Sequence, residues 1–214
     1  MARTIAIFDL DGTITRRDTY LPFLFMCARE IGVKPPHVLL AFHLVRYSIG
    51  AINNQTLKEA FLSKFLAGVH LKDIEAISER FVEQLLEREI NPRVSSALQE
   101  HLRQKHRVIL ATASFDLYIT HLARKLGISE AVCTKAEVRA EKLTGRILGE
   151  NCHGLVKLKR LEEILGERDW DDCVFYTDHH SDLPVLKKAR RGYLVNPGTK
   201  TQRMLKDYNF QVLK

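Results

Sequence analysis

The sequence lacks the features that mark several common classes of protein. Its four cysteines include no pair at CxxC spacing, so neither a zinc knuckle nor a thiol redox motif is indicated, and reduced thiols are expected. The most apolar later stretch, residues 38–52, is interrupted by His43, Arg46 and Gly50 and is too short and too polar to span a bilayer. Internal repeats and low-complexity tracts are also missing. The 45% of hydrophobic residues predicts a globular chain with a substantial core.

The sequence also lacks an excess of negative charge, and the sign of its net charge indicates which kinds of partner the protein suits. Lysine and arginine outnumber aspartate and glutamate by 33 to 26, which gives a formal net charge of +7. Such a balance suits nucleic acid, an anionic membrane or phosphorylated small molecules. The basic residues are scattered in short groups, so we expect no nucleic-acid partner. Because Met1 leads almost directly into an apolar strand, without room for a signal peptide, we expect a cytoplasmic protein.

The periodicity of the apolar residues changes along the chain. Residues 3–9 form a continuous apolar run, typical of a strand that is buried on both faces of a parallel sheet. Residues 20–89 have a helical pattern that predicts about four helices, separated at Pro35-Pro36 and at residues 50–54. After Pro92 strands and helices alternate. Strands are expected at residues 107–111, 131–134, 173–176 and 192–195, helices at 94–104, 115–126, 157–165 and 183–188, and a hairpin at 137–140 and 143–147.

This alternation predicts an α/β fold with a doubly wound, parallel, Rossmann-like sheet. Residues 16–90 then form an all-helical cap domain, inserted after the first strand. The core domain comprises residues 1–15 and 91–214. The cap is expected to cover the carboxyl ends of the strands, where open α/β sheets bind their ligands.

Two carboxylates directly follow the first strand, in the segment Asp9-Leu10-Asp11-Gly12-Thr13. Asp9 is suited to attack phosphorus as a nucleophile. Asp11 is suited to protonate the leaving oxygen and then to activate water. Gly12 permits the tight turn and Thr13 supports the loop. A solvated acidic turn is the alternative interpretation of this segment alone.

Two further segments offer groups that bind phosphate. Thr112, Ala113 and Ser114 follow an apolar strand, and a helix that begins there would direct its N–H groups at phosphoryl oxygens. Taken alone, an ordinary helix cap is the favoured interpretation. Lys157 opens a helix after Gly154, and its ammonium group would neutralise both the phosphate and the nucleophilic carboxylate.

A second pair of carboxylates follows a later strand. Asp178 would complete an oxygen-rich Mg²⁺ site with Asp9 and the backbone carbonyl of Asp11. Asp182 would either hold a metal-bound water or pair with Lys157. The adjacent His179 and His180 suggest a transition metal, but carboxylate ligands favour a hard cation.

In order and placement, these segments resemble the haloacid dehalogenase superfamily. Residues 8–15, FDLDGTIT, match its DxDGT motif. Thr112 fits the hydroxyl motif, Lys157 the lysine motif, and Asp178 with Asp182 the DxxxD motif. The helical insertion and residues 149–157 resemble the phosphoserine-phosphatase-like branch. The resemblance implies a Mg²⁺-dependent phosphatase that hydrolyses a phosphate monoester through an aspartyl-phosphate, and an aspartate at position 11 favours phosphatase over dehalogenase.

The implied substrate is a small phosphorylated metabolite, such as a phosphoserine-like compound. Asp18 stands where phosphoserine phosphatases have a glutamate that meets the substrate's amino group, and we favour a helix-capping role over a substrate-selecting one. Arg46, Arg80 and Arg88 are the arginines considered for a substrate carboxylate. The sequence does not indicate an oligomeric state.

Two alternatives remain open. The first is a lipid-phosphate phosphatase of the phosphatidylglycerophosphate type, with residues 36–52 resting on an anionic membrane. A buried pair of cap helices is the preferred interpretation of that stretch. The second is a non-catalytic basic binding module, which has no need for the six site residues Asp9, Asp11, Thr112, Lys157, Asp178 and Asp182.

Overall fold

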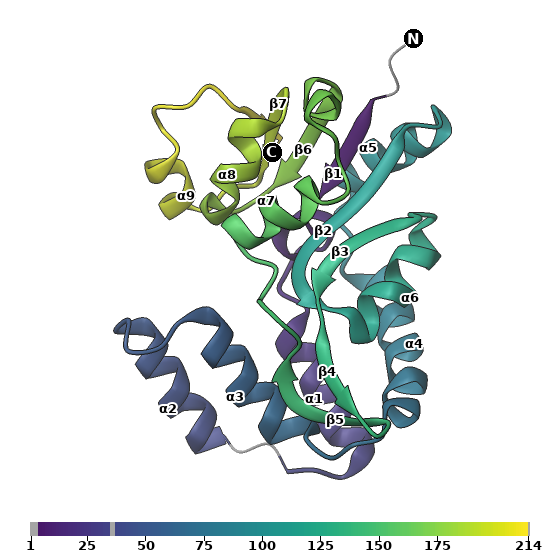
Figure 1. Ribbon diagram of the computed structural model, residues 1–214, viewed down its shortest axis with the longest axis vertical. Coiled ribbons are helices and arrows are strands. Elements are labelled where there is room, and N and C mark those ends of the chain that lie inside the picture. Colours follow the sequence, from purple (N-terminus) through teal and green to yellow (C-terminus); the bar gives the residue numbers. More distant parts are fainter. Residues whose placement is uncertain (1–3, 35–36, 214) are drawn as a thin grey trace.

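The computed structural model describes residues 4–34 and 37–213, so the predicted break at Pro35-Pro36 lies outside the described residues. A six-stranded sheet in the order β3-β2-β1-β6-β7-β8 forms the centre (Figure 1). All neighbouring strands in it are parallel. The strands are β1 (Ile5–Phe8), β2 (Arg107–Phe115), β3 (Glu130–Thr134), β6 (Cys173–Thr177), β7 (Arg191–Val195) and β8 (Gln211–Leu213).

The first strand is central because it is apolar on both faces. Ala6 and Phe8 belong to one hydrophobic cluster, whereas Ile5 and Ile7 belong to the cluster on the opposite side of the sheet, as alternating side chains require. Helices cover both faces: α5 (Pro92–Arg103), α6 (Asp116–Leu126), α7 (Leu155–Glu162), α8 (Leu183–Lys188) and α9 (Thr199–Met204). The predicted doubly wound α/β fold is confirmed.

The register of the sheet places the end of β1 between the end of β6 and the middle of β2. Phe8, the last residue of β1, pairs with Leu110 of β2 on one side and with Tyr176 of β6 on the other. Residues that follow these positions therefore meet at the carboxyl edge of the sheet. A tight turn (Leu10–Ile14) follows β1, and a short 3₁₀ helix (His180–Asp182) follows β6; another 3₁₀ helix (Glu167–Asp172) precedes β6.

The insertion after the first strand is helical, as expected. It contains α1 (Tyr20–Ile31), α2 (His37–Ser48), α3 (Asn54–Leu66) and α4 (Leu71–Arg88). The helices α1 and α4 pack on α6 through aromatic rings, with Phe23 and Phe81 both against Tyr118. One apolar cluster therefore runs from the insertion to the sheet.

The predicted hairpin forms as β4 (Ala136–Arg139) and β5 (Lys142–Ile147) and packs against α3. Leu143 donates its N–H to Val69 O at 2.9 Å and accepts from Gly68 N at 2.7 Å. A segment far along the chain thus lies beside the helical insertion (Figure 1). Sequence periodicity identified this hairpin but not its partner, because the contact depends on tertiary packing.

The structure corrects one expectation about local structure and adds two elements that were not predicted. The strand β2 continues to Phe115 and α6 begins at Asp116, so no helix starts at Thr112. The small and hydroxyl residues at 112–114 suit a helix start in sequence, but they extend the strand through a register shift beside β3. The strand at residues 191–195 is followed by α9 and β8, which the periodicity did not reveal because both are short and mostly exposed.

The expectation of a buried helix pair is wrong for α2. Leu40 is its one buried side chain among the described residues, and α2 lies at the periphery, packed chiefly on α3 (Figure 1). Within residues 4–34 and 37–213, no helix is long and apolar enough to cross a membrane.

We predict that Gly145→Ala weakens the contact between the hairpin and α3. An alanine Cβ at Gly145 would stand 2.5 Å from Ser63 Cα, in a backbone with φ of +83°. Gly149, with φ of +77°, faces open space, so Gly149→Ala is the control for backbone strain alone, about 1–2 kcal/mol. Overpacking should add about 1–3 kcal/mol at Gly145. Equal losses in urea unfolding of the two variants would contradict this account.

Candidate active site

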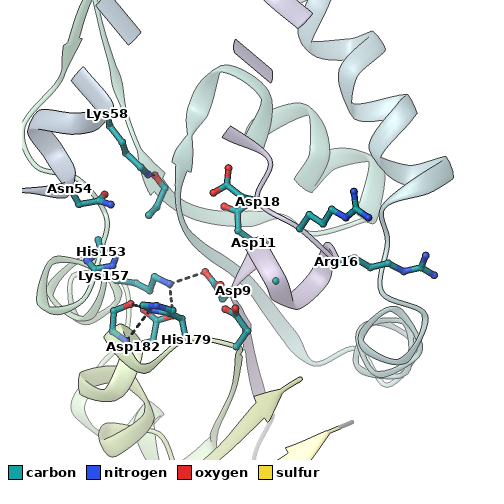
Figure 2. Close-up of a pocket in the computed structure, with 15 residues that line it drawn as sticks. Asp9, Asp11, Arg16, Asp18, Asn54, Lys58, His153, Lys157, His179 and Asp182 are labelled. Carbon is teal, nitrogen blue, oxygen red and sulfur yellow. Dashed lines mark hydrogen bonds and ion pairs between the residues drawn. The ribbon is translucent and has the colours of Figure 1, made fainter. Parts of the chain in front are cut away.

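A pocket of about 390 Å³ lies at the carboxyl edge of the sheet, under the helical insertion. The turn after β1, the loop after β6, the start of α7 and the cap helix α3 all contribute side chains to it (Figure 2). Its lining residues are Asp9, Asp11, Gly12, Arg16, Arg17, Asp18, Asn54, Lys58, Ala113, His153, Lys157, Asp178, His179, Ser181 and Asp182.

The centre of the pocket is a buried lysine between two buried carboxylates. Lys157 Nζ lies 2.8 Å from Asp9 Oδ1 and 2.7 Å from Asp182 Oδ2 (Figure 2). Burial alone would lower the pKa of Lys157, but Asp182 and Asp9 outweigh it and the net shift is upward. Burial raises the pKa of Asp9 to about 8, against the effect of Lys157. One ammonium is thus shared by two carboxylates, which leaves negative charge in the pocket unbalanced.

Asp182 forms the ion pair with Lys157, one of the two predicted roles. The hydroxyl of Thr177, the last residue of β6, donates to Asp182 Oδ2 at 2.8 Å and fixes the carboxylate at the strand end. The other oxygen, Asp182 Oδ1, is buried and has no hydrogen-bond partner among the described residues. Such an orphaned acceptor destabilises the folded state unless a donor or a cation reaches it.

Asp11 is held by hydroxyl and amide donors. Its Oδ1 accepts from Thr19 N at 2.7 Å and from Thr19 Oγ1 at 2.6 Å, and its Oδ2 accepts from Ser114 Oγ at 2.7 Å. The Thr19 hydroxyl also contacts the Tyr118 hydroxyl at 2.8 Å. These contacts fix the Asp11 carboxylate at the pocket wall, in the same group of carboxylates as Asp9 and Asp178.

Asp178 lies against Gly12 in the pocket wall. Gly12 has φ of +77°, and a Cβ on it would stand only 2.6 Å from Asp178 Cγ, so a glycine is needed both for the turn and for this approach. Burial raises the pKa of Asp178 to about 7, with Asp182 and Asp11 adding to the effect. A buried carboxylate whose charge is opposed by Asp182 and Asp11 fits a site that receives a cation.

The donor set fits a hard cation with few protein ligands. The described residues contain no group of three or more His, Cys, Asp or Glu side chains arranged to hold a metal ion. The predicted Mg²⁺ site needs only two carboxylates, Asp9 and Asp178, with the Asp11 carbonyl, because Mg²⁺ retains several waters. His179 Nδ1 is instead occupied by Ser181 Oγ at 2.8 Å.

The hydroxyl segment lies deeper than predicted. Thr112 is fully buried and its Oγ1 accepts from Ser114 N at 3.0 Å, while Ser114 supports Asp11. Ala113 is the member of this segment that lines the pocket. Thr13 is buried as well, with no hydrogen-bond partner for its hydroxyl among the described residues. The phosphate-binding role of this segment stays a prediction.

The helical insertion supplies residues that sequence reasoning missed. Lys58 of α3 donates to Ala113 O at 2.6 Å, and burial lowers its pKa to about 8 against the effect of Asp11 and Asp18. Asn54 lies one helical turn earlier on the same face and also lines the pocket. Nothing local distinguishes this lysine from other helix lysines, and only the packing of α3 against β5 directs it inward.

Asp18 lies at the pocket and also caps a helix. Its Oδ1 accepts from Tyr20 N at 3.0 Å and from Leu21 N at 3.4 Å at the start of α1. The arginines at the pocket are Arg16 and Arg17. The arginines considered from sequence, Arg46, Arg80 and Arg88, do not line it, and Arg80 forms an ion pair with Glu30 instead.

Comparison with known proteins decides the family. A family model described as haloacid dehalogenase-like hydrolase matches residues 6–187. The chain belongs to this family. The match confirms the predicted resemblance, and with it an enzyme of the hydrolase class rather than a non-catalytic module.

Relatives of this haloacid dehalogenase-like hydrolase have names that agree with the expected phosphatase activity. It is 25% identical over 214 residues to phosphoserine phosphatase SerB1 of Mycobacterium tuberculosis, covering 97% of this chain and 69% of the relative. A crystal structure of a protein of unknown function from Bordetella pertussis Tohama I has a TM-score of 0.87 at 23% identity, covering 100% of this chain and 99% of the other. A substrate-bound phosphoserine phosphatase has a TM-score of 0.71 at 19% identity, covering 100% and 94%.

We predict that Asp178→Asn changes the pH dependence of stability of the metal-free hydrolase. The raised pKa means that the Asp178 carboxyl opposes folding increasingly as pH rises from its ordinary value, 3.8, through about 7. In EDTA, the variant should therefore gain ~1–2 kcal/mol relative to the unsubstituted protein between about pH 5 and about pH 8. Asp171→Asn, at an exposed carboxylate outside the pocket, should gain nothing. A stability difference for Asp178→Asn that does not grow with pH in urea unfolding would refute this account.

Proposed function

We propose that this haloacid dehalogenase-like hydrolase is a Mg²⁺-dependent phosphatase that hydrolyses a small, polar phosphate monoester through an aspartyl-phosphate. The observation that carries the proposal is the buried contact of Lys157 with Asp9 and Asp182, at 2.8 Å and 2.7 Å, at the carboxyl edge of the sheet. A buried carboxylate that faces a pocket and shares one ammonium with another acid is poised to meet an electrophile.

The residues divide the reaction into two displacements at phosphorus. Because Lys157 contacts Asp9 Oδ1, we assign attack to Oδ2: it forms a bond to phosphorus as the ester P–O bond breaks. Asp11 gives its proton to the departing oxygen and then takes one from water. The water oxygen attacks phosphorus, the bond to Asp9 breaks and inorganic phosphate leaves. Lys157 balances the negative charge that accumulates between phosphate and Asp9.

Mg²⁺ is the cofactor that the donor set favours. Asp9 and Asp178 would hold it by their side chains and Asp11 by its backbone carbonyl, in agreement with the charge that Lys157 leaves unbalanced. Bound there, the ion would neutralise the phosphoryl oxygens as the two anions approach. Ala113, the member of the Thr112–Ser114 segment that lines the pocket, would meet a remaining phosphoryl oxygen through its backbone, as positioning is a large part of phosphoryl-transfer catalysis.

The pocket favours a charged leaving group. Gly12 and Ala113 are the lining residues without a polar side chain, so the wall offers little to an acyl chain. Lys58 would meet a carboxylate or a second anionic group of the substrate, and Asp18 an amino group. A phosphoserine-like compound carries both, and the name of the mycobacterial relative supports this class. The lipid-phosphate alternative gains no support from the pocket wall.

Replacement of the nucleophile should abolish turnover without unfolding the protein. Asp9→Asn keeps the shape of the side chain but removes the attacking charge, so kcat should fall at least ~10³-fold. Asp116→Asn is the control, because Asp116 is a half-buried carboxylate that accepts Ala136 N outside the pocket. Steady-state kinetics on an aryl phosphate with Mg²⁺ measures both. An Asp9→Asn variant with near-normal kcat would exclude the mechanism.

Removal of the cap lysine should affect the choice of substrate. For an ester whose leaving group carries a carboxylate, Lys58→Met should lower kcat/KM ~10-fold or more, because a charge-assisted hydrogen bond is lost. For an aryl phosphate, whose leaving group carries no carboxylate, the loss of kcat/KM should be smaller. Lys64→Met, at an exposed lysine of the same helix, is the control. Equal losses for both esters would mean that Lys58 does not contact the leaving group.

A further inference from the structure

The outer helix of the insertion exposes an apolar stripe. Val38, Phe42 and Val45 of α2, with Ile49 just after it, are 87%, 55%, 58% and 72% exposed. Their spacing of four, three and four residues places them on one helix face. In α4, by contrast, the apolar residues Ile74, Ile77, Phe81, Val82 and Leu85 are buried. We call the four exposed residues the α2 stripe.

The surface around the α2 stripe is basic and contains no acid of its own. Residues 31–58 include no aspartate or glutamate, whereas they include the exposed Lys34 and the half-buried Arg46. The third cation of this range, Lys58, points into the pocket instead. The Arg46 guanidinium lies over the Phe42 ring, 5.6 Å from its centroid, so a cation stands beside the stripe. Both flanking acids are engaged elsewhere: Glu30 pairs with Arg80, and Glu59 accepts Ile147 N at 3.0 Å.

We propose that α2 docks on an anionic phospholipid surface, with its stripe at the level of the headgroups and upper acyl chains. A helix that combines an apolar face with basic flanks binds such an interface in its plane. Anionic lipids also supply the negative charge that residues 31–58 lack. Twelve residues of α2 extend only about 18 Å, so the helix lies on the bilayer rather than across it.

A second copy of the chain fits this surface less well. In a symmetric pair the same patch meets itself, so Lys34 and Arg46 of both copies would approach without a counter-charge from residues 31–58. A lipid headgroup has no such conflict. The proposal goes beyond the proposed phosphatase and does not depend on it, since the pocket lining includes no member of the stripe. Asn54, five residues after Ile49, does line the pocket, so docking would hold the pocket near the membrane.

Sedimentation with vesicles tests the proposal. The protein should sediment with phosphatidylcholine vesicles that contain about one third phosphatidylglycerol and not with pure phosphatidylcholine. High salt should release it, because the screening length shortens with ionic strength. Absence of salt-sensitive binding to the anionic vesicles would overturn the proposal.

Matched variants assign the binding to the stripe. Phe42→Ser with Val45→Ser removes apolar surface without changing charge and should weaken binding at least ~10-fold. Gln99→Ser with Thr120→Ser, at exposed positions of α5 and α6, should bind as the unsubstituted protein does. Equal binding by both double variants would overturn the proposal. So would a dimer in vesicle-free sedimentation equilibrium that the stripe variant alone dissociates, because the stripe would then be a subunit contact. Unchanged circular dichroism and hydrolysis establish that the variants are folded.

Discussion

The buried Lys157 is the constraint on which the pocket depends. Asp9 follows β1 and Asp182 follows the neighbouring β6, so parallel pairing brings two carboxylates to one edge of the sheet. Two buried anions without a cation would be costly. The ammonium of Lys157, delivered by α7, lies within 2.8 Å of both. Without this ammonium the two carboxylates would face each other with no cation between them. The pairing of the strands, the position of α7 and the ion pair therefore depend on one another.

The remaining acids are accommodated by different means. The Asp11 carboxylate accepts hydrogen bonds from Thr19 and Ser114, so the loop before the cap and the end of β2 both hold it in place. Asp178 lies against Gly12 with a pKa raised to about 7 by burial and its acidic neighbours. On the Asp11 side of the pocket, the chain itself therefore supplies the hydrogen bonds that the carboxylate needs. The Asp178 side has an excess of negative charge that suits a cation. This asymmetry is what the proposed phosphatase chemistry uses.

The predictable parts of the molecule are those that depend on strand ends. Asp9 and Asp178 could be placed together from sequence because each follows an apolar strand, and parallel strands end at the same edge. The position of Lys58 could not be predicted, because its direction depends on the packing of α3 against β5, a strand that begins at Lys142. The helix start predicted at Thr112 is wrong because small hydroxyl residues suit both a helix start and an extended strand. The exposure of α2 was missed because apolar composition does not say whether a neighbour covers it.

The central claim is that Asp9 carries the phosphoryl group during turnover. Its most direct test is an acid quench of the enzyme during steady-state hydrolysis of an aryl phosphate, followed by mass spectrometry of the peptides. The account predicts a phosphoryl group on the peptide that contains Asp9, absent from the Asp9→Asn variant. Rapid hydrolysis with no phosphorylated peptide, or with the phosphoryl group on His153 or His179, would contradict it.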